Sequence, residues 1–182
     1  MVYEYNYENG IEIKIWDDEL PTQNCGVIKK IIKDFGGNGK CLDKNKSMAV
    51  ELRMPKNVSN YAMLGVVYKK DDTECRIEIE TNDYEEIEYT ENIALNPDYI
   101  HMGIPEDYVA GIEKCFNING EKTINDGIYK FCVGAHGEVG SSILSFAITC
   151  NILIKLLITE IISKDKVEEI IKSEIMQYKI RL

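Results

Sequence analysis

The sequence is short of histidine, proline and tryptophan. It has two histidines, four prolines and one tryptophan in 182 residues. Its six cysteines form no Cys-x-x-Cys pair, and neither His101 nor His136 has a second ligand at zinc-binding spacing. We therefore predict no metal and no cofactor, and interpret the cysteines as free thiols that mostly fill core positions.

Three kinds of segment are also missing. No GxxxxGK[ST] loop occurs, which excludes a GTPase that carries its own nucleotide site. The first residues lack the basic and apolar regions of a signal peptide. The most apolar stretch, 142–162, contains Lys155 and Glu160, whereas a membrane-spanning helix needs about 20 apolar residues. We expect a cytoplasmic protein that does not enter a membrane.

Acidic residues dominate one segment of the chain. The net charge is −10, and residues 71–91 alone carry ten acids against one base. This acidic belt disfavours binding to nucleic acid and suits a basic protein partner; a solubilising surface is the alternative. The predicted partner-binding residues are Asp71, Asp72, Glu74, Glu78, Glu80, Asp83, Glu85, Glu86 and Glu88.

The periodicity of apolar residues predicts one α+β domain over residues 1–182, with an antiparallel sheet and helices on one face. Residues 1–40 are predicted to form a hairpin and a short helix over 21–35, which ends at Gly36-Gly37-Asn38-Gly39. In the hairpin, a three-residue loop with Gly10 left-handed would pair Tyr7 with Ile11 and place the Tyr and Ile rows on one face.

The remaining elements are predicted from the same patterns. Strands are expected over 48–54, 62–69 and 74–80, then a helix from Pro105 to Phe116 and a strand over 128–133. An almost wholly apolar helix over 142–162 should be covered on several sides. These parts form a core over 46–162, and a last amphipathic helix is expected within 165–180.

Residues 60–162 resemble domain IV of elongation factor G and its relatives. The first matching segment is Ile-Pro followed by an acid, Tyr and later Glu-Lys, carried here by Ile104, Pro105, Asp107, Tyr108, Gly111, Ile112, Glu113 and Lys114. The second runs from Asp-Gly-x-Tyr to a Ser-Ser and a Phe, carried here by Asp126, Gly127, Tyr129, Val139, Ser141, Ser142 and Phe146. The resemblance implies an α+β fold without catalytic residues, in an arm that enters the ribosome.

The Gly-rich stretch 134–142 leads into the apolar helix and is the candidate anion-binding corner. Its predicted ligands are Gly137, Gly140, Ser141 and Ser142, because unpaired amides at a helix N-terminus can hold a phosphate or carboxylate. The stretch is similar to the glycine/serine loop of the galactokinase–homoserine kinase–mevalonate kinase family, although Glu138 stands where that loop has glycine. The alternative is structural, with Ser141 as the N-cap.

Three functions follow from these features. The first is a non-enzymatic acidic module that binds a basic protein, of the kind seen in inhibitors and immunity proteins. The second is a ribosome- or translation-associated factor. The third is an anion- or nucleotide-binding enzyme that uses the Gly-rich loop. A Ser–Lys pair like that of Lon protease would need Lys179, because Lys155 lies ~20 Å away along the same helix and is out of reach. His136 could serve as a base, and an ordinary surface-loop histidine is the alternative. No catalytic residues are predicted, and the pattern does not determine an oligomeric state.

Overall fold

Strands contain more residues than helices in this fold. The computed structural model describes residues 1–8, 10–36, 39–55, 60–83, 87–95, 98–116 and 124–180, with side chains to residue 177. The strands are β1 (Val2–Asn6), β2 (Glu12–Asp17), β3 (Lys29–Asp34), β4 (Lys46–Arg53), β5 (Tyr61–Lys69), β6 (Cys75–Thr81), β7 (Ile87–Glu88), β8 (Ile100–Met102) and β9 (Gly127–Gly137). The helices are the 3₁₀ turn η1 (Glu106–Tyr108), α1 (Val109–Phe116), α2 (Ile143–Leu157) and α3 (Lys164–Ile180).

In the described ranges the strands form one mixed sheet in the order β1-β2-β4-β5-β9-β6-β3. Short β8 pairs with the end of β9, and β7 pairs with β8. The β6–β9 pair is parallel and the other strand pairs are antiparallel. A parallel pair needs a crossover connection between its strands, and the crossover from β6 to β9 contains β7, β8, η1 and α1. The predicted α+β fold with a mainly antiparallel sheet is confirmed.

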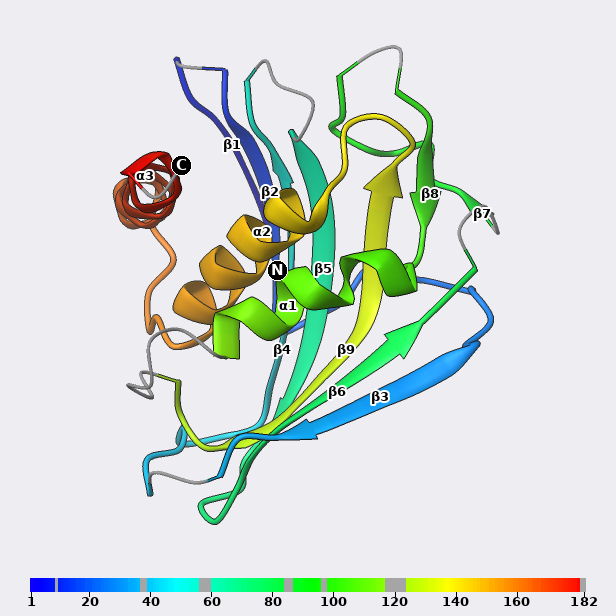
Figure 1. The fold of residues 1–182 in the computed structure, drawn as a ribbon. Coiled ribbons are helices and arrows are strands. Elements are labelled where there is room, and N and C mark those ends of the chain that lie inside the picture. The colour runs from blue at the N-terminus through cyan, green and yellow to red at the C-terminus, as the bar shows by residue number, and fades with distance from the viewer. Residues whose placement is uncertain are drawn as a thin grey trace.

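The main core lies between the sheet and the helices α1 and α2, which both lie on one face of it (Figure 1). Helix α2 has twelve buried residues, as its nearly continuous apolar sequence predicts. Tyr108 stacks on Phe146, with ring centroids 4.6 Å apart, and joins η1 to α2. At Gly111 a Cβ would lie 2.5 Å from the carbonyl oxygen of Ile143, so only glycine permits this close approach of α1 and α2.

A second, smaller core lies on the opposite face. Its buried residues include Trp16, Tyr61, Met63, Val133 and Ala135. Residues of the segment before β3 and of the segments on either side of β8 cover them. No helix covers this face in the described structure (Figure 1).

A β-bulge lets side chains of β9 pack into both cores. Gly65 pairs with Val133 but Val66 pairs with Phe131, so Cys132 is an extra residue. Before the bulge Phe131 packs with the helices, and after it Val133 faces the second core.

The N-terminal hairpin confirms the three-residue loop. Tyr3 pairs with Ile15 and Tyr5 with Ile13, while the amide of Tyr7 donates to the carbonyl of Ile11 at 2.9 Å. Gly10 has φ of 82°, the left-handed conformation that this loop requires. Both rows of side chains therefore face the main core.

The helix predicted over 21–35 is wrong: residues 21–28 form no helix or strand, and strand β3 follows them. The apolar spacing of Val27, Ile28, Ile31 and Ile32 fits a helix, but these β-branched residues favour a strand when a partner is available. Strand β6 supplies that partner along the whole of β3. Gly36 accordingly follows a strand rather than a helix, and Gly36 and Gly39 have φ of 65° and 79°; Gly37 and Asn38 lie outside the described residues.

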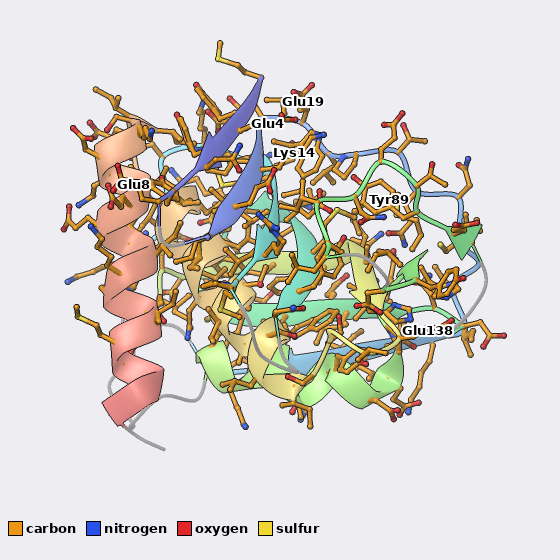
Figure 2. All side chains as sticks on the ribbon, turned by 90° about the horizontal axis from the view of Figure 1, so that it is seen from above. Glu4, Glu8, Lys14, Glu19, Tyr89 and Glu138 are labelled. Atoms are coloured by element: carbon orange, nitrogen blue, oxygen red, sulfur yellow. The ribbon has the colours of Figure 1, made fainter. Side chains whose placement is uncertain are left out.

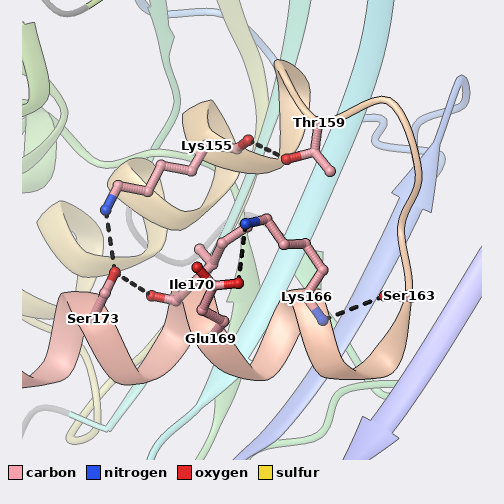
Figure 3. A network of polar contacts seen from close by, with 7 residues as sticks. All are labelled: Lys155, Thr159, Ser163, Lys166, Glu169, Ile170 and Ser173. Carbon is pink, nitrogen blue, oxygen red and sulfur yellow. Dashed lines mark hydrogen bonds and ion pairs between the residues drawn. The ribbon is translucent and has the colours of Figure 1, made fainter.

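Helix α3 packs on α2 through a polar network (Figure 3). The Lys155 ammonium donates to the Ser173 hydroxyl at 3.2 Å and pairs with the buried carboxylate of Glu174. The Ser173 hydroxyl donates to the carbonyl of Ile170 at 2.9 Å. Near the start of α3, the Lys166 amide donates to the Ser163 hydroxyl at 3.3 Å. None of the described helices is long and apolar enough to span a membrane.

Candidate functional site

The acidic residues of β6 are paired with basic residues of the neighbouring strands. Cys75, Ile77 and Ile79 are buried while the residues between them face outward. Glu78 forms an ion pair with Lys30 of β3, and Glu80 forms one with Lys130 of β9, each at 2.7 Å. These two carboxylates therefore do not present net negative charge to a partner.

Acidic and basic side chains are also paired at the start of β6, on the same face of the sheet. Arg76 contacts Glu74 at 2.9 Å and Asp34 at 2.8 Å. Asp71 accepts hydrogen bonds from the hydroxyl and amide of Thr73, and these bonds lower the pKa of Asp71. Much of the predicted acidic belt is thus a set of ion pairs and a local turn.

The acidity that remains lies in the crossover from β6 to β9. Residues 81–113 contain nine acids and no lysine or arginine, and two of these acids, Glu106 and Glu113, pair with Lys29 and Lys33 of β3. Asp83 and Glu88 of the predicted set are exposed there, and Asp72 is exposed in the turn before β6. Glu85 and Glu86 lie outside the described residues.

Two exposed apolar residues lie on neighbouring backbone segments, one in this crossover and one just after β9. Tyr99 is 65% exposed and Val139 is 67% exposed. The amide of Glu138 donates to the carbonyl of Tyr99 at 3.0 Å, which joins segments forty residues apart. We name Tyr99 and Val139, with Leu95 in the adjoining turn, the Tyr99 patch; Leu95 is 37% exposed.

Carboxylates border the Tyr99 patch. Glu138 contacts Nε2 of His101 at 3.0 Å, and Glu88 lies opposite His101 in the β7–β8 pair. Glu138 lies at the margin of the molecule, away from helix α3 (Figure 2). An exposed aromatic and aliphatic centre with a charged rim is the usual composition of a protein-binding site.

The Gly-rich corner already holds a carboxylate of its own chain. The Oδ1 atom of Asp98 accepts a hydrogen bond from the amide of Val139 at 3.0 Å, and its Oδ2 atom accepts one from Gly140 at 2.8 Å. A Cβ on Gly137 would lie 2.0 Å from Asp98 Oδ2, and one on Gly140 would lie 2.5 Å from it. The glycines thus make room for Asp98, and an incoming phosphate would have to displace it.

The two serines have structural partners. Ser141 accepts a hydrogen bond from the amide of Gly137 and donates to the carbonyl of Tyr61, both at 2.8 Å. The predicted N-cap at Ser141 is wrong by one residue, because Ser142 caps α2 in a reciprocal capping box with Ser145. Ser142 rather than Ser141 caps the helix because the Ser141 hydroxyl bonds the ends of β9 and β5 instead.

The bases suggested for serine catalysis lie elsewhere. His136 is fully buried in β9, not on a surface loop, and its Nδ1 atom is 3.4 Å from the carbonyl oxygen of Gly103. Lys155 pairs with Glu174 on α3, and the side chain of Lys179 lies outside the described part of the chain.

Sequence reasoning missed a buried carboxylate in the second core. Glu51 of β4 is fully buried and accepts hydrogen bonds from the Tyr61 hydroxyl at 2.7 Å, the Tyr89 hydroxyl at 3.4 Å and the Ile93 amide at 3.0 Å. Burial raises the pKa of Glu51, although these bonds and Lys14 act in the opposite direction. Its only local signal is an acid between apolar residues of a strand.

Comparisons with known proteins identify no relative. No family model, no curated protein and no solved structure matches the chain. Among the described side chains, no group of three or more histidine, cysteine, aspartate or glutamate residues could hold a metal ion. The candidate site therefore depends on the geometry of the Tyr99 patch and its acidic surroundings.

Proposed function

We propose that this chain is a non-enzymatic module that binds a basic protein through the Tyr99 patch. The observation that carries the proposal is that Tyr99 and Val139, both mostly exposed, lie on backbone segments joined by the Glu138–Tyr99 hydrogen bond, where the crossover segment contains no lysine or arginine of its own. Burying an exposed Tyr and Val supplies affinity, and the surrounding carboxylates favour a cationic partner.

The pairing of the β6 acids supports this location over the centre of the predicted belt. Glu78 and Glu80 would have to leave Lys30 and Lys130 before they could bind cations of a partner. Two other carboxylates lie nearer the patch. Glu138 contacts His101, and Glu88 lies opposite His101 in the β7–β8 pair. Long-range attraction by the net charge of −10 would accelerate association with a basic protein at low salt.

A capture experiment with matched variants tests the proposal. The immobilised chain is incubated with cell extract, and the retained proteins are compared for wild type, Tyr99→Ala and Val67→Ala. Val67 is a suitable control because it is 37% exposed on the sheet, on a strand that does not contribute to the patch.

We expect a basic protein that wild type and Val67→Ala retain and Tyr99→Ala loses. With that protein purified, Tyr99→Ala should weaken binding by about tenfold or more, and added salt should weaken the wild-type complex. Equal capture by all three forms, or affinity indifferent to salt, would overturn the proposal.

Ribosome association is a second candidate. What favours it is the predicted order of three strands, helix, strand and helix, which corresponds to β4, β5, β6, α1, β9 and α2 with the short strands β7 and β8 between β6 and α1. Co-sedimentation of the purified chain with ribosomes at low salt tests it, and a chain that stays in the supernatant contradicts it.

A further inference from the structure

Strand β3 lies at the edge of the sheet with part of its backbone facing away from it. The order of strands gives β3 one neighbour, β6, among the described strands, and Figure 1 shows it along the margin of the sheet. The amide of Phe35 donates to the carbonyl of Cys75 at 2.7 Å, which makes them a hydrogen-bonded pair. Such pairs alternate along an antiparallel ladder, so the N–H and C=O groups of Lys30, Ile32 and Asp34 point outward.

This edge also exposes apolar side chains. Ile32 is 53% exposed and Ile28, just before the strand, is 66% exposed. An edge strand of this kind is a template for pairing with another strand. Lys30, Ile32 and Asp34 alternate along the strand and so share one face of the sheet.

The charges on β3 are complementary to a second β3. In an antiparallel pairing that places Ile32 opposite Ile32 of a second copy, Lys30 lies opposite Asp34 of that copy, and Asp34 lies opposite its Lys30. The three residues with outward backbone groups are then the ones that face each other, so both the hydrogen bonds and the side chains are in register. Each copy presents the same patch, as a two-fold interface requires.

The existing ion pairs extend this complementarity. Lys30 already contacts Glu78, and Asp34 already contacts Arg76. Pairing across the two-fold axis would join these contacts into a network of alternating charges over the interface.

The other edge of the sheet is unsuited to the same pairing. The amide of Tyr7 bonds the carbonyl of Ile11, so the outward groups of β1 belong to Val2, Glu4 and Asn6. A symmetric pairing about the central residue would place Glu4 opposite Glu4 of a second copy. Like charges directly opposite each other disfavour a strand pair.

We propose that two copies of this chain associate through antiparallel pairing of their β3 strands about Ile32, which continues the sheet across a two-fold axis. This interface is separate from the Tyr99 patch, so failure of either proposal leaves the other standing.

Charge variants of the full chain provide the test. In Lys30→Glu, residue 30 faces Asp34 of the second copy with the same sign; in Asp34→Lys, residue 34 faces Lys30 with the same sign. By sedimentation velocity we expect wild type to form dimers and each variant alone to dissociate at least about tenfold more readily. An equimolar mixture should recover dimers, because every facing pair in the heterodimer then has opposite charges.

The mixture also controls for misfolding. Each substitution has the same effect on the fold of its own chain whether the variant is alone or mixed, so recovery of dimers must come from the facing charges. A third variant, Ile32→Pro, removes an outward N–H that β6 does not use, so it should be folded by circular dichroism and monomeric by sedimentation velocity. A wild-type chain that stays monomeric at every concentration tested, or a variant mixture that recovers no dimer, would overturn the proposal.

Discussion

Asp98 shows how one residue determines what the Gly-rich corner can bind. Its carboxylate occupies the amides of Val139 and Gly140, the groups that an external anion would need. We expect Asp98→Ala to lower the free energy of unfolding by about 2 kcal/mol, because two amides lose a charged acceptor. Chemical denaturation of the variant and wild type measures this loss.

Phosphate provides the matched readout for the same variant. Wild type should show no rise in melting temperature with phosphate, whereas Asp98→Ala, with its amides vacated, should show one if the corner retains its shape. Stabilisation of wild type by phosphate would contradict the assignment of the corner to Asp98.

Glu51 makes the free energy of unfolding depend on pH. Burial raises its pKa above the ordinary value of 4.5, so the folded chain holds this proton more tightly than the unfolded chain. The stability it contributes is present below the unfolded pKa and is lost as pH rises through the folded pKa. Glu51→Gln has no such loss, so its stability relative to wild type should improve as pH rises from about 4 to neutrality.

Denaturation of wild type and Glu51→Gln at several pH values measures this trend. Tyr61→Phe is a useful companion, because it removes a hydrogen bond that holds the pKa of Glu51 down and should extend the loss of stability to higher pH. A difference between wild type and Glu51→Gln that does not change with pH would refute the prediction.

At the scale of elements, helix α2 depends on its first turn. Ser142 and Ser145 satisfy each other's amides in the capping box. We expect Ser142→Ala to lower the free energy of unfolding by about 1 kcal/mol, and Ser142→Gly to cost only a few tenths. Urea denaturation distinguishes the two; equal losses would show that the cap does not act as described.

The sequence predicts elements well where the pattern is local. The hairpin register follows from the spacing around Gly10, and α2 follows from its apolar run. Strand β3 could not be predicted, because the spacing of Ile28, Ile31 and Ile32 fits a helix as well. Its partner β6 lies over forty residues away, and the pairing decides the outcome.

The site was predictable only in part, for a related reason. The acidity of residues 71–91 is evident in the sequence, but the pairing of Glu78 with Lys30 and of Glu80 with Lys130 depends on the order of strands in the sheet. Nothing near Asp98 in the sequence indicates that it fills the glycine corner. The net charge of a segment in the sequence therefore does not give the charge of the surface to which that segment contributes in the fold.

At the scale of the whole molecule, the six thiols report on the fold. Cys75, Cys115 and Cys150 are buried, while Cys25, Cys41 and Cys132 are partly exposed. Alkylation of the native chain should modify the second set first, because the thiolate must be reached by the reagent. Within that set, Cys132 should react slowly, since burial raises its pKa.

Peptide mass spectrometry after timed alkylation identifies the modified thiols, and the unfolded chain, in which all six should react, is the control. Early modification of Cys115 or Cys150 in the native chain would contradict the packing of α1 against α2.

The bulge at Cys132 makes length, rather than chemistry, the quantity that β9 must preserve. Replacing Cys132 by another small residue leaves Phe131 and Val133 facing their separate cores. Removing it would shift the frame of every residue from Val133 to Gly137 by one, turning Val133 and Ala135 toward the helices and His136 toward the second core. Related chains should therefore vary among small residue types at this position, but they should not gain or lose a residue there.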